Sequence, residues 1–532
     1  MPKFLARLSI YFNRLDQPRA IILLLVLHIA LWTLTQALAT SNLDRYGDML
    51  ENYAWGQILE WGSFKHPPLF AWVTGLWFKL FPQSDYFYHL LAYFNVALGL
   101  LGVALLARAM RLSALALPAV VLLCLAFPYS TLAAKFNANA VLLSVWPWVA
   151  LAWWHSLHQT KPSSALLWSL SFGVFAALAM LGKYYSGVLL LSLFIVSWSL
   201  PSGRAWLFSW RSWLTLGSFL LCLTPHAYWL QQHEFISLRY VAEQGEGAVA
   251  WSQIGRFFLA PVLYWGLPWL LCCVIFSQPE SRWTKLGKRL VLSWMPRSWY
   301  DSLFWLAMLP WLITLLFGVA GMVELSLPWA IPIGFAYPLL WLRNLCGDEH
   351  DLQSAEKLGI HTLSLLKVFL IILLLLPVLG ILQGWREAQR GSDNYYLPRR
   401  EAAQEILQIW QTRYPNTAAQ WVGGAWGENA LMAFYGDAQL RILPGVPDQF
   451  PATISPLADW QNRPGLLLCP PTPLDPAAQT ACDGEMQNWL AQQGQTEPPI
   501  QVTLAREGWR FPLRRAYAYH AYIYWPKSLA AH

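Results

Sequence analysis

The feature that most constrains the fold of this chain is a series of apolar runs, each about as long as a bilayer is thick. The chain has 532 residues, of which 56% are hydrophobic and only 12% are charged. A helix needs about 20 apolar residues to cross the hydrocarbon core of a membrane, where every backbone polar group must be bonded internally. The sequence therefore predicts an α-helical protein that crosses a membrane many times.

The positions of the runs predict about eleven transmembrane helices in residues 1–386. The expected spans cover residues 20–38, 87–107, 112–128, 137–156, 164–182, 184–200, 212–230, 257–277, 302–320, 326–342 and 368–385. The apolar segment 69–81 is shorter and follows two prolines, so we expect it to be an interfacial helix that lies on the membrane.

The charges of the loops predict how these spans are oriented. Most loop Lys and Arg residues lie on the side of the N-terminus, which the positive-inside rule places in the cytoplasm. With an odd number of spans, the first outer loop (39–86) and the C-terminal part then lie outside, in the periplasm of a bacterium. The first run follows a basic N-terminus and has no evident cleavage site, so we expect a retained anchor. The net charge of +7 is distributed over short loops, which argues against nucleic-acid binding.

The composition changes after residue 386, where apolar runs give way to shorter amphipathic pieces. We expect a soluble periplasmic α/β domain over 387–532, with helices at 401–414 and 484–493 and strands at 420–425, 466–469, 500–504 and 517–524. Cys469 and Cys482 are the pair in this domain. In an oxidising compartment they could form a disulfide, and two unpaired thiols are the alternative. The remaining cysteines lack metal-ligand spacing, so no metal site is indicated.

The outer side of the predicted membrane domain collects most of the side chains that could carry chemistry. In the first outer loop, Asp48 and Glu51 are spaced to share one face of a short helix. The same loop ends in Lys65 and His66 followed by two prolines, which hold the chain extended. Later outer loops contribute further polar side chains, among them Asn139, Lys183, Tyr184, Arg239 and Glu324.

A carboxylate surrounded by several cations suits group transfer from a phosphate ester. The carboxylate acts as a base toward an acceptor hydroxyl or amine, and the cations hold the phosphate leaving group. Lys183 is the most informative of the cations, because apolar runs flank it on both sides and leave it almost no loop. Lys79 and Arg256, beside apolar segments, are better explained as snorkelling anchors.

The pattern of the first outer loop resembles membrane glycosyltransferases of the GT-C class, in particular bacterial relatives of protein O-mannosyltransferases and of the lipid A aminoarabinose transferase. The resemblance rests on an Asp followed by a Glu, then aromatic, amide and glycine positions, then His-Pro-Pro-Leu. In this chain these elements are Asp48, Glu51, Tyr53, Trp55, Gln57, Gly62, Phe64, His66, Pro67, Pro68 and Leu69. It continues at residues 139–146 and 181–184 and covers about residues 20–345.

The resemblance implies an inverting transfer of a sugar from a polyprenyl-phosphate-linked donor to a lipid, glycan or protein acceptor. It assigns Asp48 as the catalytic base, and Glu51 is a supporting candidate for a catalytic carboxylate. It places His66, Lys183 and Tyr184 near the donor phosphate, with Lys65 and Arg239 as further phosphate contacts. Tyr53, Asn139 and Glu324 are the expected contacts of the acceptor or sugar.

Two departures from the family pattern bear on these roles. Met49 stands where the family often has a Glu, and Asn139 stands where many relatives have an Asp. The second departure removes a carboxylate that would help to bind a metal. No cofactor is therefore required by the pattern, and a divalent metal is possible but not indicated.

Two other classes of function remain open at this stage. A transporter or lipid-linked sugar flippase would also need many spans, but it predicts charged groups in mid-membrane and inverted repeats. A non-enzymatic scaffold that presents the outer domain gives no reason for Lys183 or for the His-Pro-Pro loop. The sequence does not specify the sugar, the acceptor, the oligomeric state or the role of the C-terminal domain.

Overall fold

The computed structural model describes residues 17–44, 47–243, 249–276, 284–346, 352–443, 445–446, 459–507 and 514–526. The chain divides into two compact units. The helical unit comprises Met1–Thr33, Phe64–Leu69 and Ala92–Leu376. The sheet unit comprises Leu34–Ser63, Phe70–Leu91 and Pro377–His532, so it is assembled from three separate stretches of chain.

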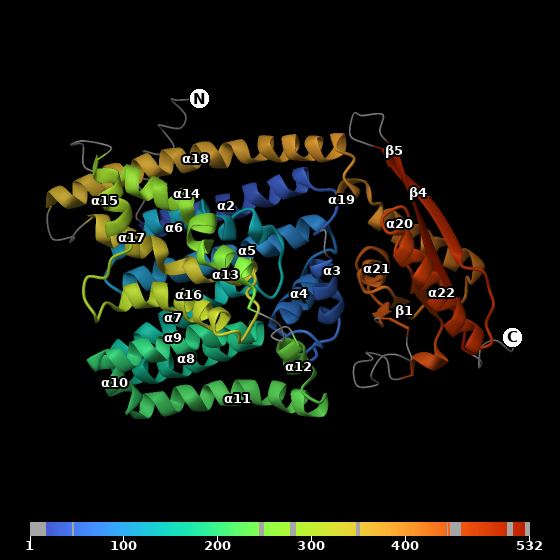
Figure 1. Cartoon of the computed structure of the whole chain (residues 1–532), viewed down its shortest axis with the longest axis horizontal. Helices are drawn as coiled ribbons and strands as arrows, with labels where there is room; N and C mark the ends of the chain where they lie inside the picture. The colour runs from blue at the N-terminus through green and yellow to red at the C-terminus, as the bar shows by residue number, and fades with distance from the viewer. Residues whose placement is uncertain are drawn as a thin grey trace. The chain divides into compact units, whose positions relative to one another are not determined.

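The helical unit is built from long apolar helices joined by short loops and single 3-10 turns (Figure 1). Its α-helices are α2 (Gln17–Ala39), α5 (Asp85–Ala109), α6 (Ala116–Cys124), α7 (Val141–His158), α8 (Pro162–Gly182), α9 (Gly187–Ser199), α10 (Pro201–Leu207), α11 (Trp210–Gln232), α12 (Ile236–Glu243), α13 (Trp251–Phe258), α14 (Ala260–Ile275), α15 (Thr284–Leu292), α16 (Ser302–Val319), α17 (Tyr337–Cys346) and α18 (Leu352–Gln389). The 3-10 turns are η1 (Ser113–Leu115), η2 (Phe127–Tyr129), η3 (Leu132–Ala134), η4 (Tyr184–Ser186), η5 (Leu327–Ala330) and η6 (Ile333–Ala336). Parts of α2, α5 and α18 belong to the sheet unit.

The length and composition of these helices confirm a helical protein that crosses a membrane several times. Among the described residues, 6 helices are long and apolar enough to cross, or up to 8 if each of two bent helix pairs is one span. The number of eleven spans is not confirmed. Two of the predicted spans coincide with α7 and α11, which carry several Trp, His and Ser side chains that lower their hydropathy. The predicted span 326–342 is divided among η5, η6 and α17.

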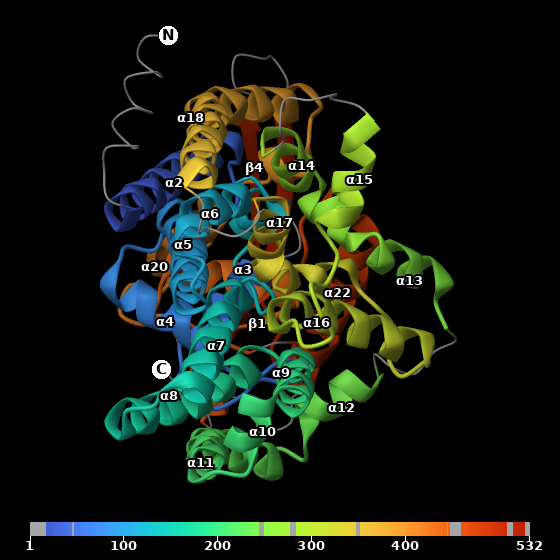
Figure 2. The same cartoon turned by 90° about the vertical axis from the view of Figure 1, so that its left-hand side faces the viewer.

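Small side chains allow close packing among α7, α8 and α11, which Figure 2 shows near α9 and α10. A Cβ atom on Gly173 of α8 would collide with the backbone oxygen of Thr215 on α11. Buried tryptophans then join neighbouring helices by hydrogen bonds, as Trp153 does to Ser197 at 2.8 Å and Trp206 to Ser156 at 2.7 Å. Close approach at small residues and interhelical hydrogen bonds are the main attractions between helices in lipid.

The sheet unit combines two helices from early in the chain with a mixed sheet from its end. The early helices are α3 (Asp48–Gly56) and α4 (Leu69–Leu80). The later elements are α19 (Asp393–Tyr396), α20 (Arg399–Arg413), β1 (Trp421–Gly424), α21 (Trp426–Leu431), the π-helical turn η7 (Met432–Gly436), β2 (Arg441–Ile442), η9 (Trp460–Asn462), β3 (Gly465–Leu468), α22 (Pro476–Gln492), β4 (Ile500–Glu507) and β5 (Arg514–Tyr524). A helix at 69–81 was predicted, and α4 has nearly those bounds.

The strands described form one sheet in the order β2-β1-β3-β5-β4. Strand β1 is parallel to β2 and β3, whereas β5 is antiparallel to β3 and β4. On one face, Trp421 and Tyr522 pack with Trp489 of α22 in a buried apolar core. Elsewhere on the sheet, α20 packs on β4 and α21 packs on β1. The predicted α/β character of the C-terminal part is confirmed.

A disulfide joins Cys469, which follows β3, to Cys482 on α22. Cys469 is fully buried in the apolar core of the sheet unit, and Cys482 packs against the same core. The covalent link therefore ties α22 to the sheet at the place where their apolar faces meet.

Candidate active site

Helix α3 carries the two carboxylates that the sequence singles out, and its start is well defined. Asp44 caps it: its two carboxylate oxygens accept from the backbone amides of Asp48 at 3.0 Å and Met49 at 2.8 Å. A carboxylate at a helix N-terminus satisfies orphan amides and meets the positive end of the helix dipole. Gly47, just before the helix, has φ 77°, a conformation that favours glycine. Asp48 is thereby held in the first turn of a fixed short helix.

Asp48 and Glu51 lie on this one helix, as their spacing predicts, but in different surroundings. The Asp48 side chain is partly exposed. Glu51 is only 8% exposed, and its Oε1 accepts a hydrogen bond of 2.6 Å from Nε1 of Trp426 on α21. Asp48 is therefore partly open to solvent, whereas Glu51 is engaged in a contact inside the sheet unit.

Tyr53, on the next turn of α3, is a buried phenol. Its ring packs edge-on against Phe78 of α4 and Phe434 of η7, with centroids 5.6 and 5.1 Å away. Gln83 donates a hydrogen bond to its hydroxyl oxygen. Burial raises the pKa of Tyr53 to about 12, so the phenol stays neutral at physiological pH and is a hydrogen-bonding group, not a base.

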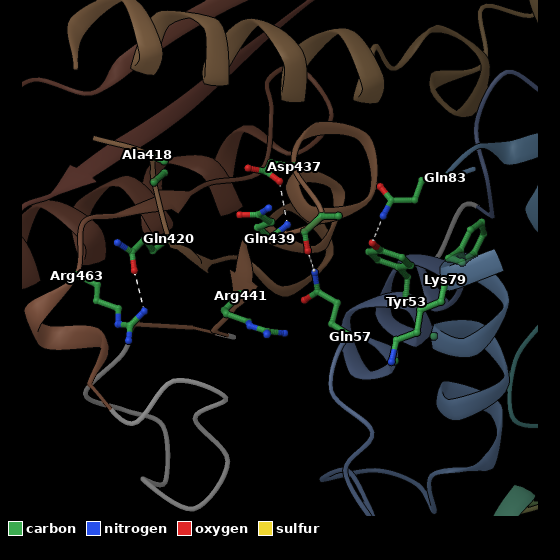
Figure 3. Close-up of a pocket in the computed structure, with 15 residues that line it drawn as sticks. Tyr53, Gln57, Lys79, Gln83, Ala418, Gln420, Asp437, Gln439, Arg441 and Arg463 are labelled. Atoms are coloured by element: carbon green, nitrogen blue, oxygen red, sulfur yellow. Dashed lines mark hydrogen bonds between the residues drawn. The ribbon is translucent and has the colours of Figure 1, made fainter. Parts of the chain in front are cut away.

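Tyr53 also forms part of the wall of a polar cavity of about 730 Å³ within the sheet unit (Figure 3). One wall comes from α3, α4 and Gln83, and the other from residues 418–420, 437–441 and 463. Gln57 joins the two walls, because its Nε2 donates to the backbone oxygens of Ala438 and Leu440 at 3.1 and 2.9 Å. This cavity was not predicted from the sequence. Its two walls come from distant parts of the chain, with Gln57 and Ala438 381 positions apart, and no local motif marks them.

In the helical unit, the structure brings together Lys183 and Asn139, which the sequence placed in separate loops. Lys183 has an extended backbone, with φ −167° and ψ 136°, between the end of α8 and η4. Its Nζ donates to Oδ1 of Asn139 at 2.6 Å and lies 5.3 Å from the ring centroid of Trp329. A cation above an aromatic face and beside an amide oxygen is well stabilised and fixed in direction.

Tyr184, the next residue, is held in a second polar cluster. Its hydroxyl forms hydrogen bonds with Nε2 of His226 at 2.8 Å and with Oγ of Ser237 at 2.7 Å. His226 lies on α11 and Ser237 on α12. The polar side chains at the end of α8 therefore link this helix to two others. His226 is a functional candidate that sequence reasoning missed, because a lone His in an apolar run gives no pattern.

The other predicted phosphate-binding side chains lie in the same unit. The ring of His66 meets Tyr240 of α12 edge-on at 6.3 Å, and Nζ of Lys65 lies 5.4 Å from the ring centroid of Phe64. Arg239 is exposed and pairs with exposed Glu234 at 3.1 Å. Such a surface pair contributes little to stability.

The predicted site residues thus belong to two sets. Asp48, Glu51 and Tyr53 belong to the sheet unit, and the remaining ones of the transfer site belong to the helical unit. Glu324 is exposed between α16 and η5, and within the described ranges no hydrogen bond or ion pair joins it to the other predicted residues. In the same part of the chain, no group of three or more His, Cys, Asp or Glu side chains is placed to hold a metal ion.

Part of the chain matches a known protein family, and the fold of nearly the whole chain is similar to solved structures. Residues 65–229 match the family model described as dolichyl-phosphate-mannose-protein mannosyltransferase. The fold is similar to that of ArnT from Cupriavidus metallidurans bound to undecaprenyl phosphate, with a TM-score of 0.57 and 14% identity over 93% of this chain and 97% of that one. The apo structure of the same ArnT gives a TM-score of 0.54 and 16% identity over 94% and 98%. No curated protein sequence matches this chain.

These findings define a membrane protein with the GT-C fold, the fold of a class of membrane glycosyltransferases. The family segment includes His66, Asn139 and Lys183. The resemblance expected from the motifs is confirmed at this level: residues 65–229 match the mannosyltransferase family model, and the fold is similar to that of ArnT.

Proposed function

We propose that this protein is an inverting glycosyltransferase of the bacterial inner membrane. It moves a sugar from a polyprenyl-phosphate-linked donor to a lipid, glycan or protein acceptor on the periplasmic face. The ArnT of similar fold was crystallised with undecaprenyl phosphate, which supports a donor of this chemical class. The disulfide between Cys469 and Cys482 supports a periplasmic position of the C-terminal sheet, because disulfides persist in oxidising compartments.

The observation that carries the proposal is the polar cluster at the break after α8. Lys183, bonded to Asn139, and Tyr184, bonded to His226 and Ser237, lie between helices that are otherwise apolar. Ionisable groups among membrane helices are expensive to maintain and mark binding sites for polar ligands. A polyprenyl phosphate is such a ligand, with an isoprenoid chain that suits the apolar helices and phosphate oxygens that suit an ammonium group.

In the proposed reaction, the acceptor oxygen or nitrogen attacks the anomeric carbon of the donor sugar. Asp48 takes the acceptor proton as the new bond forms, which requires a carboxylate that the acceptor can reach. The bond between the anomeric carbon and the phosphate oxygen breaks, and the phosphate leaves with the electron pair. Lys183 and His66, with Lys65 and Arg239 as further contacts, neutralise the charge on that leaving group.

The central test replaces the proposed base without changing its size. We expect Asp48→Asn to keep the melting temperature of the wild type and to abolish transfer of radiolabel from a polyprenyl-phosphate sugar to membrane acceptors. The matched control is Glu405→Gln, an exposed carboxylate on α20, which should keep full activity. A wild-type rate of transfer by the purified Asp48→Asn variant would refute the proposed mechanism.

A second test addresses the donor phosphate. Lys183→Gln removes the charge but keeps a hydrogen-bond donor near Asn139, so we expect the apparent affinity for the donor to fall by about tenfold or more. Lys161→Gln, at the other end of α8, is the control and should leave donor binding unchanged. Equal donor affinity in the two variants would remove Lys183 from the phosphate site.

A further inference from the structure

The cavity lined by Tyr53 and Gln57 has an unusual charge distribution. Three of its lining side chains are cationic, namely Lys79, Arg441 and Arg463, and one is anionic, Asp437. Arg463 is already engaged, since it pairs with Asp459 at 2.9 Å and donates to Oε1 of Gln420 at 2.8 Å. The side chains that line the cavity therefore carry a net positive charge.

The other two cations, Lys79 and Arg441, differ from Arg463 in their surroundings. Among the described residues, no hydrogen bond or ion pair engages the ammonium of Lys79 or the guanidinium of Arg441. Figure 3 shows Arg441 extending toward the wall formed by α3 and α4, from which Lys79 projects. Two cations that face one space repel each other, and an anion placed between them relieves that repulsion.

The remaining lining is suited to a sugar more than to a bare ion. Amide side chains of Gln83, Gln420 and Gln439 present donors and acceptors around the space, and Phe78 adds an aromatic surface. Amides in this number match the many hydroxyls of a saccharide, and aromatic faces stack on its C–H groups. A volume of about 730 Å³ is also far larger than a single phosphate needs.

We propose that this cavity binds a phosphorylated saccharide, with Arg441 and Lys79 on the phosphate and the amides on the sugar hydroxyls. The site differs from the one around Lys183 and would hold the anionic headgroup of the acceptor. Only this last assignment rests on the proposed transferase function; binding of the phosphorylated sugar does not. Lys79 then has a ligand-binding role in place of the snorkelling role that its sequence context suggests.

The test measures binding to the full-length purified protein in detergent, with N-acetylglucosamine 1-phosphate as the probe and N-acetylglucosamine as its uncharged counterpart. We expect the phosphorylated sugar to bind more tightly and its affinity to fall with ionic strength, as charge pairing requires. The double variant Lys79→Gln/Arg441→Gln should lose about tenfold or more of that affinity. Arg413→Gln, an exposed cation on α20 outside the cavity, should lose none.

Equal binding of the two sugars, or unchanged affinity in a double variant that keeps the wild-type melting temperature, would overturn the proposal. A second measurement separates the two sources of a sugar phosphate. Unchanged binding of undecaprenyl phosphate and of its sugar conjugate by the double variant supports the acceptor side. Weaker binding of the conjugate alone would overturn the acceptor assignment and make the cavity a donor-sugar site. A wild type that binds the probe but transfers no sugar would refute the proposed function and leave this site standing.

Discussion

At the scale of single residues, two carboxylates three positions apart have acquired different properties. Asp48 is partly exposed in the first turn of α3, whereas Glu51 is buried and bonded to Trp426. The sequence spacing indicates that both carboxylates face one side of a helix. It does not show which of the two is covered by another part of the chain. Position 426 lies far along the chain and belongs to no motif, so only the fold reveals that Glu51 is engaged.

This difference predicts unequal effects of substitution. Glu51→Gln keeps an oxygen that accepts from Trp426, so we expect a melting temperature and a transfer rate close to those of the wild type. Glu51→Ala leaves the indole N–H of Trp426 without its partner, which costs about 1–3 kcal/mol of stability. Thermal unfolding and transfer assays on both variants check this. If Glu51→Gln proves as inactive as Asp48→Asn, Glu51 takes part in the chemistry directly.

A second prediction at this scale concerns Glu428 on α21. The side chain is 8% exposed, its Oε2 has no hydrogen-bond partner among the described residues, and burial raises its pKa. A raised pKa in the folded state means that the stability contributed by the neutral carboxyl is lost as pH rises through that pKa. We expect Glu428→Gln, which cannot ionise, to raise the melting temperature at neutral pH more than at acidic pH. A gain that is the same at both pH values, or equal to that of the exposed control Glu405→Gln, contradicts this.

At the scale of elements, α3 and α4 make direct backbone contact at two glycines. A Cβ atom on Gly75 would overlap the backbone oxygen of Gly56, and one on Gly56 would come within 2.5 Å of the backbone oxygen of Ala71. The two helices are therefore packed too closely for a side chain at either glycine, which fixes α3 relative to the wall of the cavity that α4 contributes.

We expect Gly75→Ala to force these helices apart and to destabilise the sheet unit by about 1–3 kcal/mol, the usual cost of overpacking. The matched control is Gly484→Ala on α22, where an added Cβ meets nothing within 4 Å. That change should be neutral or slightly stabilising, because alanine favours a helix. The melting temperatures of both variants test this prediction. An unchanged melting temperature for Gly75→Ala would show that the two helices can move apart at little cost.

Most strands and the two longer helices of the C-terminal part were predictable, whereas two of its very short elements and one bend between helices were not. Strands β1, β3, β4 and β5 and helices α20 and α22 all overlap segments predicted from the sequence. Strand β2 has two residues, and η7 is a single π-helical turn, so neither is long enough to show a period. The predicted span 184–200 is followed by a bend of 110° at Pro201, and its hydropathy alone gives no sign of that bend.

The contacts of the candidate site residues were only partly predictable. Sequence patterns singled out Lys183 and Asn139 individually, and the structure joined them. The partners of Tyr184 and the entire cavity beside Tyr53 depend on contacts between distant segments, for which a single sequence carries no signal.

At the scale of the whole molecule, the sheet unit is discontinuous in the chain. Residues 34–63 and 70–91 complete their packing with residues from 377 onward. The contacts are specific: Glu51 bonds to Trp426, Gln57 to Ala438, and Asp85 to Tyr435. The C-terminal part therefore packs in one compact unit with residues from early in the chain.

This organisation predicts the effect of removing residues 393–532. We expect backbone amides in α3 to exchange with solvent at least about tenfold faster in the truncated protein, because buried contacts that oppose local opening are lost. Amides in α8, which belongs to the helical unit, should keep their protection and serve as the internal control. Hydrogen exchange followed by mass spectrometry checks this, and unchanged protection of α3 contradicts it.

The split origin of the sheet unit also has a consequence for how the protein is made. Because synthesis proceeds from the N-terminus, α3 leaves the ribosome long before Trp426 and Ala438 exist. The segment that carries Asp48 therefore cannot form these contacts until the last part of the chain has been made. A nascent or prematurely ended chain therefore carries the sequence of α3 but lacks the partners that complete its packing.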